Sequence, residues 1–166
     1  MSNIDILIAQ HCPNGVEFKE LGEIIISLKT GLNPRKNFVL NTAKAMNYYV
    51  TVRELNGINV AFHDKTDRVN DEALKLINNR SNLEIGDVLF SGTGTIGRTA
   101  LVQREPKNWN IKEGVYVIKP KKELIFSKFL LFFLNSGQAK QQIDNKIVGS
   151  PVRSIPMAEL KKVAHF

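Results

Sequence analysis

The stretch GDVLFSGTGTIGRTALV (residues 86–102) decides the fold class of this chain. A short apolar run, Val88–Phe90, enters a loop with three glycines, and a second run, Thr99–Val102, leaves it. The loop Gly92–Gly97 matches the pattern Gly-x-Gly-x-x-Gly of dinucleotide-binding sites. Such a site needs a helix directly after the loop, whereas residues 98–103 have the alternating character of a strand. The stretch is therefore predicted to be two strands joined by a glycine-rich loop.

The residue pattern excludes two other phosphate-binding loops. A kinase-type loop requires a lysine strand with His-Arg-Asp and Asp-Phe-Gly motifs, and a Walker loop requires Gly-Lys-Ser/Thr; the chain has none of these. The glycines are expected to leave backbone N–H groups exposed, beside the hydroxyls of Ser91, Thr93 and Thr95 and the charge of Arg98. Such a loop is suited to lie against a nucleic-acid backbone. A nucleotide-binding enzyme that uses Gly92–Gly97 stays as an alternative.

The order of the remaining elements favours an α+β (mixed α/β) fold in one domain. Strands are predicted over residues 24–26, 48–52, 60–62, 88–91, 99–102 and 115–118, and helices after capping residues Ser2, Asn70 and Ser127, the last over residues 128–135 and then 138–146. Residues 29–37 are predicted to be a polar loop. Strands come first and the main helix comes late, which argues against a doubly wound sheet.

Charge and composition favour an anionic partner and a cytoplasmic protein. The 166-residue chain has a net charge of +7, and residues 98–128 hold eight Lys and Arg against three Glu. Cys12 is the only cysteine, so no internal disulfide is possible. The three histidines are scattered, so no metal site is predicted, and the apolar run 129–134 is too short to cross a bilayer. No membrane partner is expected.

No catalytic constellation stands out. Asn33-Pro34 resembles the start of the Asn-Pro-Pro-Tyr motif of adenine methyltransferases, but Arg35-Lys36 replace the second proline and the aromatic residue. A serine triad would have to use one of the three scattered histidines. We therefore expect no enzyme activity from this chain itself.

Five stretches occur in an order that is specific as a set. They are Cys12–Phe18 with Leu21–Ile24; Lys29–Gly31; Gly86–Ser91 with Thr93–Gly97; Asn110–Tyr116; and Phe129–Ser136 with Gln141, Ile143 and Gly149–Pro156. Together they span nearly the whole chain. This ordered set resembles the target recognition domain of the specificity (S) subunit of type I restriction–modification systems.

The resemblance implies a double-stranded DNA-binding module without chemistry of its own. It implies a single target recognition domain with a twisted mixed sheet, flanking helices and long DNA-facing loops, which reads one half of a bipartite target. In this family the modification (M) subunit methylates adenine with S-adenosylmethionine, and the restriction (R) subunit cleaves with ATP. These cofactors and Mg²⁺ would belong to the partner subunits, and the chain itself would bind none of them.

The chain departs from the family pattern in one respect. Family members usually have two such domains held apart by long helices, and no such helix is present before Phe166. We expect residues 1–166 to be one domain, with residues 156–166 as the start of a connection to an absent spacer helix. The chain is then a half-size subunit or a fragment, and a second recognition domain or a homodimer would complete the target site.

The candidate DNA-binding residues fall into two groups. Base contacts are expected from the polar segment 29–81, because Arg pairs with guanine and Asn with adenine in the major groove. The first group is Arg35, Lys36, Asn37, Arg53 and Arg80, with Arg68 and Asn79 as secondary candidates. Lys29 and Thr30, at the start of the same segment, are further candidates for DNA binding. The second group, expected on the DNA backbone, is Ser91, Thr93, Thr95, Arg98, Lys146, Ser150 and Arg153.

Aromatic residues and the late apolar run complete these expectations. Tyr48 and Tyr49 are adjacent on a predicted strand, so one of them should face the core. Trp109 is expected to pack in the core rather than stack on bases. A protein-interaction adaptor, with residues 129–134 docked on a partner helix, is a further alternative function.

Overall fold

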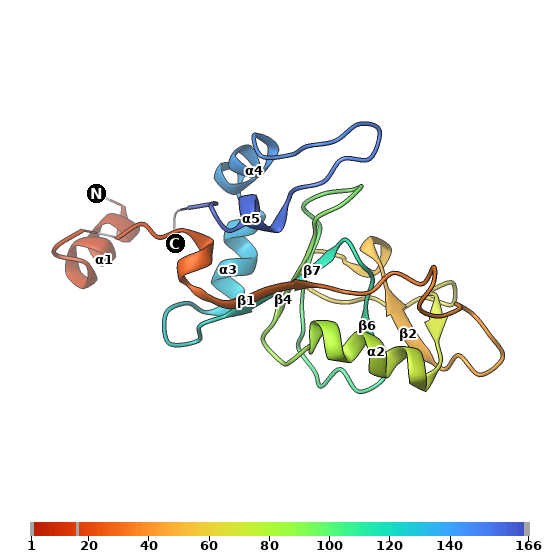
Figure 1. The fold of residues 1–166 in the computed structure, drawn as a ribbon. Coiled ribbons are helices and arrows are strands. Elements are labelled where there is room, and N and C mark those ends of the chain that lie inside the picture. Colours follow the sequence, from red (N-terminus) through yellow and green to blue (C-terminus); the bar gives the residue numbers. More distant parts are fainter. Residues whose placement is uncertain (1, 16, 165–166) are drawn as a thin grey trace.

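Two β-sheets and the helices on their outer faces make up the chain in the computed structural model, which describes residues 2–15 and 17–164 (Figure 1). The strands are β1 (Ile25–Thr30), β2 (Asn47–Val50), β3 (Arg68–Val69), β4 (Val88–Ser91), β5 (Thr99–Leu101), β6 (Trp109–Ile111) and β7 (Val115–Pro120). The helices are α1 (Asn3–His11), α2 (Asp71–Ser81), α3 (Ser127–Leu134), α4 (Gly137–Asp144) and α5 (Met157–Leu160), with 3-10 turns η1 (Leu21–Glu23) and η2 (Val52–Glu54). The predicted α+β class is confirmed.

The first sheet is antiparallel, in the order β1-β7-β4-β5. Residues 86–102 contain its β4–β5 hairpin, with Val88 opposite Leu101 and Phe90 opposite Thr99. A strand, not a helix, therefore follows the glycine loop. This confirms the predicted strand–loop–strand arrangement, and it leaves the loop without the helix N-terminus that a dinucleotide site requires.

The central strands β4 and β7 are buried on both faces. On β4, Val88 and Phe90 pack with α3, whereas Leu89 between them packs with β2 and β6. On β7, Tyr116 and Ile118 face the α3 side, whereas Val115 and Val117 face the second sheet. Alternate side chains of a strand point to opposite faces, so a strand covered on both sides must be apolar throughout. This explains the unbroken apolar runs of both strands.

The second sheet has the order β3-β2-β6, with β2 and β6 parallel. Its outer face is covered by α2, where Tyr49 and Val69 pack against Ala73 and Ile77. The predicted start of α2 is confirmed, because the Asn70 side chain accepts a hydrogen bond from the Ala73 N–H at 2.9 Å. The layers therefore run from α2 through both sheets to α3.

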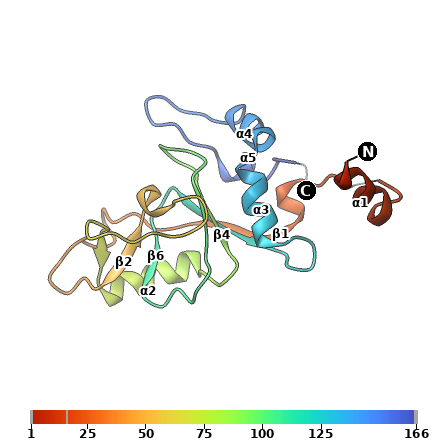
Figure 2. The same cartoon turned by 180° about the vertical axis from the view of Figure 1, so that it is seen from behind.

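Helix α1 and the two described ends of the chain lie at the far end of the first sheet (Figures 1 and 2). Ser2 caps α1 as predicted and shares a reciprocal capping box with Asp5, yet no residue of α1 is buried. Near the other end, the Leu21 N–H donates to the Val163 carbonyl at 2.8 Å. Among residues 2–15 and 17–164, no helix is long and apolar enough to span a membrane.

Two strand boundaries differ from the sequence prediction. The strand predicted over residues 24–26 is β1, which continues to Thr30 because its second half pairs with β7. Lys29 and Thr30 therefore lie in a strand rather than in a polar loop. The strand predicted over residues 48–52 ends at Val50, where η2 begins after the capping residue Thr51.

Two further predictions of local structure are wrong. Residues 60–62 form no strand in the described chain, where Val60 makes only an isolated bridge with Leu55. Ser127 does not cap α3 but is its first residue, and Phe126 occupies the N-cap position. The predicted core position of Trp109 is confirmed by its burial in the cluster between the two sheets.

An ion pair at the edge of the core gives the first prediction. Lys119 Nζ lies 3.0 Å from both carboxylate oxygens of Asp87, a side chain that is only 3% exposed. We expect Lys119→Met to lower the free energy of unfolding by about 3 kcal/mol at neutral pH, because it leaves a buried carboxylate without its counter-charge. Chemical denaturation of the two proteins would measure this loss, with exposed Lys128→Met as the matched control.

The loss should depend on pH. Burial raises the pKa of the Asp87 carboxyl, while the Glu84 N–H and the Lys119 ammonium oppose the rise. Without Lys119 that pKa rises further, so the folded variant holds the proton more tightly than its unfolded chain does. The cost of Lys119→Met is then smallest in acid, where Asp87 is protonated in both folded proteins. It grows as the pH rises from the Asp87 pKa of the folded wild type towards the higher Asp87 pKa of the folded variant. A loss that is equal at pH 4 and pH 7 would contradict this account of the pair.

Candidate nucleic-acid interface

The glycine loop lies against a second loop from the end of the chain. We call residues 92–98 and 148–155 the paired loops. The Gly94 N–H donates to the Arg153 carbonyl at 2.8 Å, and the Ile155 N–H donates to the Gly92 carbonyl at 2.9 Å. The Tyr116 hydroxyl, from β7, also donates to the Ile155 carbonyl at 2.8 Å. Both loops therefore project together from one end of β4 and β7 (Figure 1).

The backbone of the glycine loop is already hydrogen-bonded within the protein, so the predicted row of exposed N–H groups is wrong. The N–H groups of Gly92, Gly94 and Gly97 donate to the carbonyls of Gly114, Arg153 and Ser91, respectively. Gly92 also allows a close approach, because a Cβ atom there would lie 2.1 Å from the Tyr116 ring. These glycines shape the loop rather than offer donors to a ligand.

Two predicted contact residues have structural roles instead. Ser91 is fully buried, and its hydroxyl donates to the Thr95 carbonyl at 2.6 Å and accepts from the Arg98 N–H at 2.8 Å. Thr30 is buried as well, and its hydroxyl bridges the Val115 carbonyl and the Gly114 N–H. Burial keeps both side chains away from a DNA backbone on the outside of the protein, so we remove them from the candidate interface.

The paired loops carry the other predicted backbone contacts except Lys146, which precedes the second loop. Thr95, Arg98, Ser150 and Arg153 are exposed, and Thr93 is half-buried beside its bridge partner Ser154. Lys146 is half-buried, with its Nζ 3.8 Å from Glu159 Oε2. The structure thus brings residues far apart in the sequence onto one pair of loops, as the prediction requires.

A cleft adjoins the paired loops. It has a volume of about 490 Å³ and is lined by Leu55, Asn56, Gly57, Gly97, Arg98, Thr99, Asn135 and Lys140. Its walls are joined by two hydrogen bonds between Gly57 and Thr99, at 2.9 and 2.8 Å. Lys140 was not predicted, because only the packing of α4 places it beside Arg98. The cleft connects the paired loops to the chain that follows Arg53.

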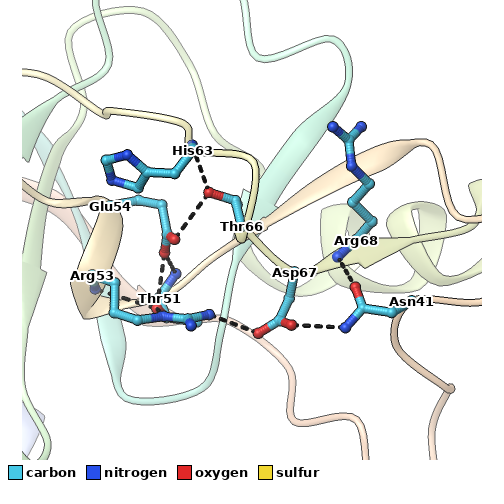
Figure 3. A network of polar contacts seen from close by, with 8 residues as sticks. All are labelled: Asn41, Thr51, Arg53, Glu54, His63, Thr66, Asp67 and Arg68. Carbon is cyan, nitrogen blue, oxygen red and sulfur yellow. Dashed lines mark hydrogen bonds and ion pairs between the residues drawn. The ribbon is translucent and has the colours of Figure 1, made fainter.

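Arg53 belongs to a polar network that joins three loops (Figure 3). Its Nη2 lies 2.8 Å from Asp67 Oδ2, and Asp67 Oδ1 accepts from Asn41 Nδ2 at 2.8 Å. Asn41 Oδ1 in turn accepts from the Arg68 N–H at 2.8 Å. No local sequence signal marked Asn41 or Asp67, since each meets its partners only in the fold.

The buried carboxylate of Glu54 stabilises the chain next to this network. Glu54 is 1% exposed and accepts hydrogen bonds from the N–H and hydroxyl of Thr51, both at 2.8 Å, and from the Thr66 hydroxyl at 3.1 Å. The Thr66 hydroxyl also accepts from the His63 N–H at 2.9 Å. A buried carboxylate with several donors is well satisfied, so the loop around Arg53 is held in one arrangement.

An aromatic stack stands beside the network. Tyr48 stacks on Phe62 at 4.3 Å between ring centroids, and the Arg68 guanidinium lies 4.3 Å from the centre of the Tyr48 ring. Tyr49 points the other way into the core, which confirms the prediction that either Tyr48 or Tyr49 faces the core. Burial raises the pKa of the Tyr49 hydroxyl well above its usual value. Arg68 is thereby held in place as Arg53 is.

The remaining base-contact candidates are spread over the surface. Arg35, Lys36 and Asn37 are exposed in a turn over residues 34–37, and Lys29 is exposed on β1. Arg80 and Asn79 are exposed on α2, which lies on the side of the sheets away from the paired loops (Figures 1 and 2). The structure thus separates Arg80 and Asn79 from Arg98 and Arg153. In the described part of the chain, no three His, Cys, Asp or Glu side chains gather as a metal site would need.

Residues 13–164 match the sequence model of the type I restriction modification DNA specificity domain. The chain belongs to this family. The match covers almost all of the chain, including both paired loops and the Asp67 network. It confirms the resemblance drawn from the five ordered stretches.

Solved structures of S subunits share the fold. The S subunit of the type I restriction–modification system from M. genitalium has a TM-score of 0.56 at 15% identity, covering 89% of this chain and 33% of that one. The HsdS subunit from Thermoanaerobacter tengcongensis has a TM-score of 0.57 at 14% identity, covering 89% of this chain and 36% of that one. A chain from a type I system, solved to describe complex assembly and conformational transition, has a TM-score of 0.60 at 14% identity. The match covers 90% of this chain and 33% of that one. This specificity domain thus spans about a third of the length of those chains. No curated protein sequence matches it significantly.

The contact between Gly92 and Tyr116 gives the second prediction. We expect Gly92→Ala to lower the free energy of unfolding by about 2 kcal/mol, because the added methyl group would overlap the Tyr116 ring and push the paired loops apart. Gly137→Ala is the matched control, since a Cβ there meets no atom within 4 Å at the start of α4. Urea denaturation would compare the three proteins; an equal effect of both substitutions would contradict the role given to Gly92.

Proposed function

We propose that this chain binds double-stranded DNA sequence-specifically and recognises one half of a bipartite target, without catalysis of its own. Membership of the specificity domain family over residues 13–164 is the observation that carries the proposal. The net charge of +7 supports it, because Lys and Arg supply most of the affinity for DNA. The strand after the glycine loop, β5, argues against the nucleotide-binding alternative.

The paired loops and the adjoining cleft are the proposed contact to the phosphate backbone. Arg98, Lys140 and Arg153 supply positive charge there, and Thr95 and Ser150 supply exposed hydroxyls. Contacts to phosphates fix the position of a protein on the duplex but carry no direct sequence information. The hydrogen bonds between the two loops hold their backbones at a constant spacing, which suits a regular phosphate backbone.

The polar network around Asp67 is the proposed contact to base edges. It holds the side chains of Arg53 and Asn41, and the neighbouring Tyr48 ring holds the guanidinium of Arg68. Arg and Asn side chains can form paired hydrogen bonds with bases. The turn with Arg35, Lys36 and Asn37 stays a proposed second contact region, together with Lys29. Because Arg80 and Asn79 lie on α2, on the other side of the sheets, a duplex on the paired loops would not reach them by this account.

The proposed partners are the other subunits of a type I system. The chain would direct a methyltransferase (M) subunit and, through it, a restriction (R) subunit to its target in the cytoplasm. S-adenosylmethionine, ATP and Mg²⁺ would be bound by those subunits rather than by this chain. A second recognition domain, or a second copy of this chain, would supply the other half of the target.

The outer face of α3 favours an additional protein contact. Phe126, Phe129 and Phe132 follow one another at helical spacing and are 81%, 53% and 58% exposed. The residues between them, such as Leu130 and Leu131, are buried in the core. The predicted adaptor stretch over residues 129–134 is therefore mostly core, with only Phe129 and Phe132 on the surface. Exposed apolar surface of this kind is typical of contacts between proteins. Such a contact would accompany DNA binding rather than replace it.

Salt dependence gives the third prediction. The chain should retard duplex DNA at low ionic strength and lose affinity steeply as salt is added, because bound cations are released from the duplex. Arg153→Ala should lower the slope of log Kd against log salt by about 1, since it removes one phosphate contact. Gel retardation over a series of salt concentrations would measure the slope.

Lys75→Ala is the matched control for this experiment. Lys75 is also exposed to solvent but lies on α2, away from the paired loops, so the slope should not change. The proposal is wrong if the folded chain fails to bind duplexes in low salt, with or without M subunits. A lower slope for Lys75→Ala and an unchanged slope for Arg153→Ala would place the interface on the other side of the molecule.

A further inference from the structure

The guanidinium of Arg53 is held along one of its edges. Nε donates to Thr51 Oγ1 at 3.3 Å, and Nη2 donates to Asp67 Oδ2 at 2.8 Å. These two nitrogens carry the N–H groups of the same side of the planar group. The side chain is nevertheless 54% exposed, so the group is both anchored and open to solvent.

The anchored edge determines which donors stay available. A guanidinium has five N–H groups, and two of them are used by Thr51 and Asp67. The adjacent edge at the end of the group, formed by Nη1 and the second N–H of Nη2, makes no hydrogen bond with any residue among 2–15 and 17–164. This edge presents two parallel donors, which match a pair of neighbouring acceptors.

Both anchors are themselves fixed. The Thr51 hydroxyl donates to Glu54 Oε2 at 2.8 Å, and the second oxygen of Asp67 accepts from Asn41 Nδ2 at 2.8 Å. Glu54 is almost fully buried, so the anchor on the Thr51 side continues into the core (Figure 3). Arg53 therefore loses less conformational freedom on binding than a free surface arginine would.

The charge of Asp67 decides between a phosphate and a base as the partner. A carboxylate 2.8 Å from the guanidinium neutralises most of its attraction for a phosphate and repels the phosphate itself. A neutral base edge suffers no such repulsion. The free edge of Arg53 is therefore better suited to a base than to the DNA backbone. Guanine is the base with two neighbouring acceptors, O6 and N7, in the major groove.

We propose that Arg53 recognises a guanine in the half-site through O6 and N7, and that Asp67 and Thr51 are positioning residues that set which edge of Arg53 faces the base. This proposal rests on the proposed function, because it requires that the chain binds duplex DNA. It adds the base and the atoms recognised.

The first experiment selects the target and then alters one atom of it. The folded chain is used to enrich binding sequences from a randomised duplex library, and the enriched duplex is measured by gel retardation. Replacing the recognised guanine with 7-deazaguanine removes the N7 acceptor and should weaken binding by about 10-fold. Replacing it with hypoxanthine, which keeps O6 and N7 and loses only the minor-groove amino group, should leave binding unchanged.

The variants then assign that effect to Arg53. Arg53→Lys keeps the charge but loses the paired donors, so it should bind the two duplexes, with guanine and with 7-deazaguanine, about equally. Asp67→Asn should reduce the guanine preference several-fold while the affinity for unrelated duplexes stays the same or rises, because a repelling charge is removed. Arg80→Lys is the matched control, because Arg80 is exposed on α2 on the other side of the sheets, and it should keep the full guanine preference.

The outcomes separate this proposal from the proposed function. If the wild-type chain binds no duplex, the proposed function fails. If it selects a sequence, but Arg53→Lys keeps every base preference while melting as the wild type does, the assignment to Arg53 is wrong and the function stands. Should Arg53→Lys fail to fold, Asp67→Asn decides, since an unchanged guanine preference in that variant would overturn the positioning role.

Discussion

The burial of β4 and β7 on both faces is the constraint on which the rest of the structure depends. One face of each strand packs with α3, and the other packs with the second sheet, so residues 88–90 of β4 and 115–118 of β7 are all apolar. Because both strands are fixed in this way, the loops at their ends leave the core at fixed points. The glycine loop starts from β4, and Tyr116 on β7 holds the second of the paired loops through the Ile155 carbonyl. The position of the proposed DNA interface is thus a consequence of the core.

The loops that carry the candidate residues are ordered mainly by polar contacts to the backbone. The side chains of Ser91 and Thr30 are buried and form hydrogen bonds with the backbone around them. The N–H groups of the glycine loop donate to carbonyls of the protein. The side chains of Arg98 and Arg153 stay exposed as a result. Glu54 and Asp67 act similarly around Arg53. In each case a buried or half-buried polar group fixes a loop, and a neighbouring exposed cation remains for a ligand.

The sequence predicts those parts of the fold that depend on local patterns. The β4–β5 hairpin follows from two apolar runs around a glycine-rich loop, and the start of α2 follows from the capping residue Asn70. The five ordered stretches identify the family. Strands β3 and β6 escape prediction because two or three residues show no periodicity. The hydrogen bond of Gly94 to Arg153 could not be predicted, since its partners are far apart in the chain. For the same reason, no local sequence pattern distinguishes Arg80 from Arg53 as a candidate, although the fold places Arg80 on α2 and Arg53 beside Asp67.

In the proposed complex the paired loops and the Asp67 network face the DNA together. An amide NMR titration of the chain with its selected duplex would show which residues contact the DNA. We expect changes at residues 92–98 and 148–155, and at the side-chain Nε–H of Arg53, while the exposed face of α2 and the Phe129 region of α3 stay unchanged. Changes confined to α2 or to α3, with none on the paired loops, would contradict this arrangement.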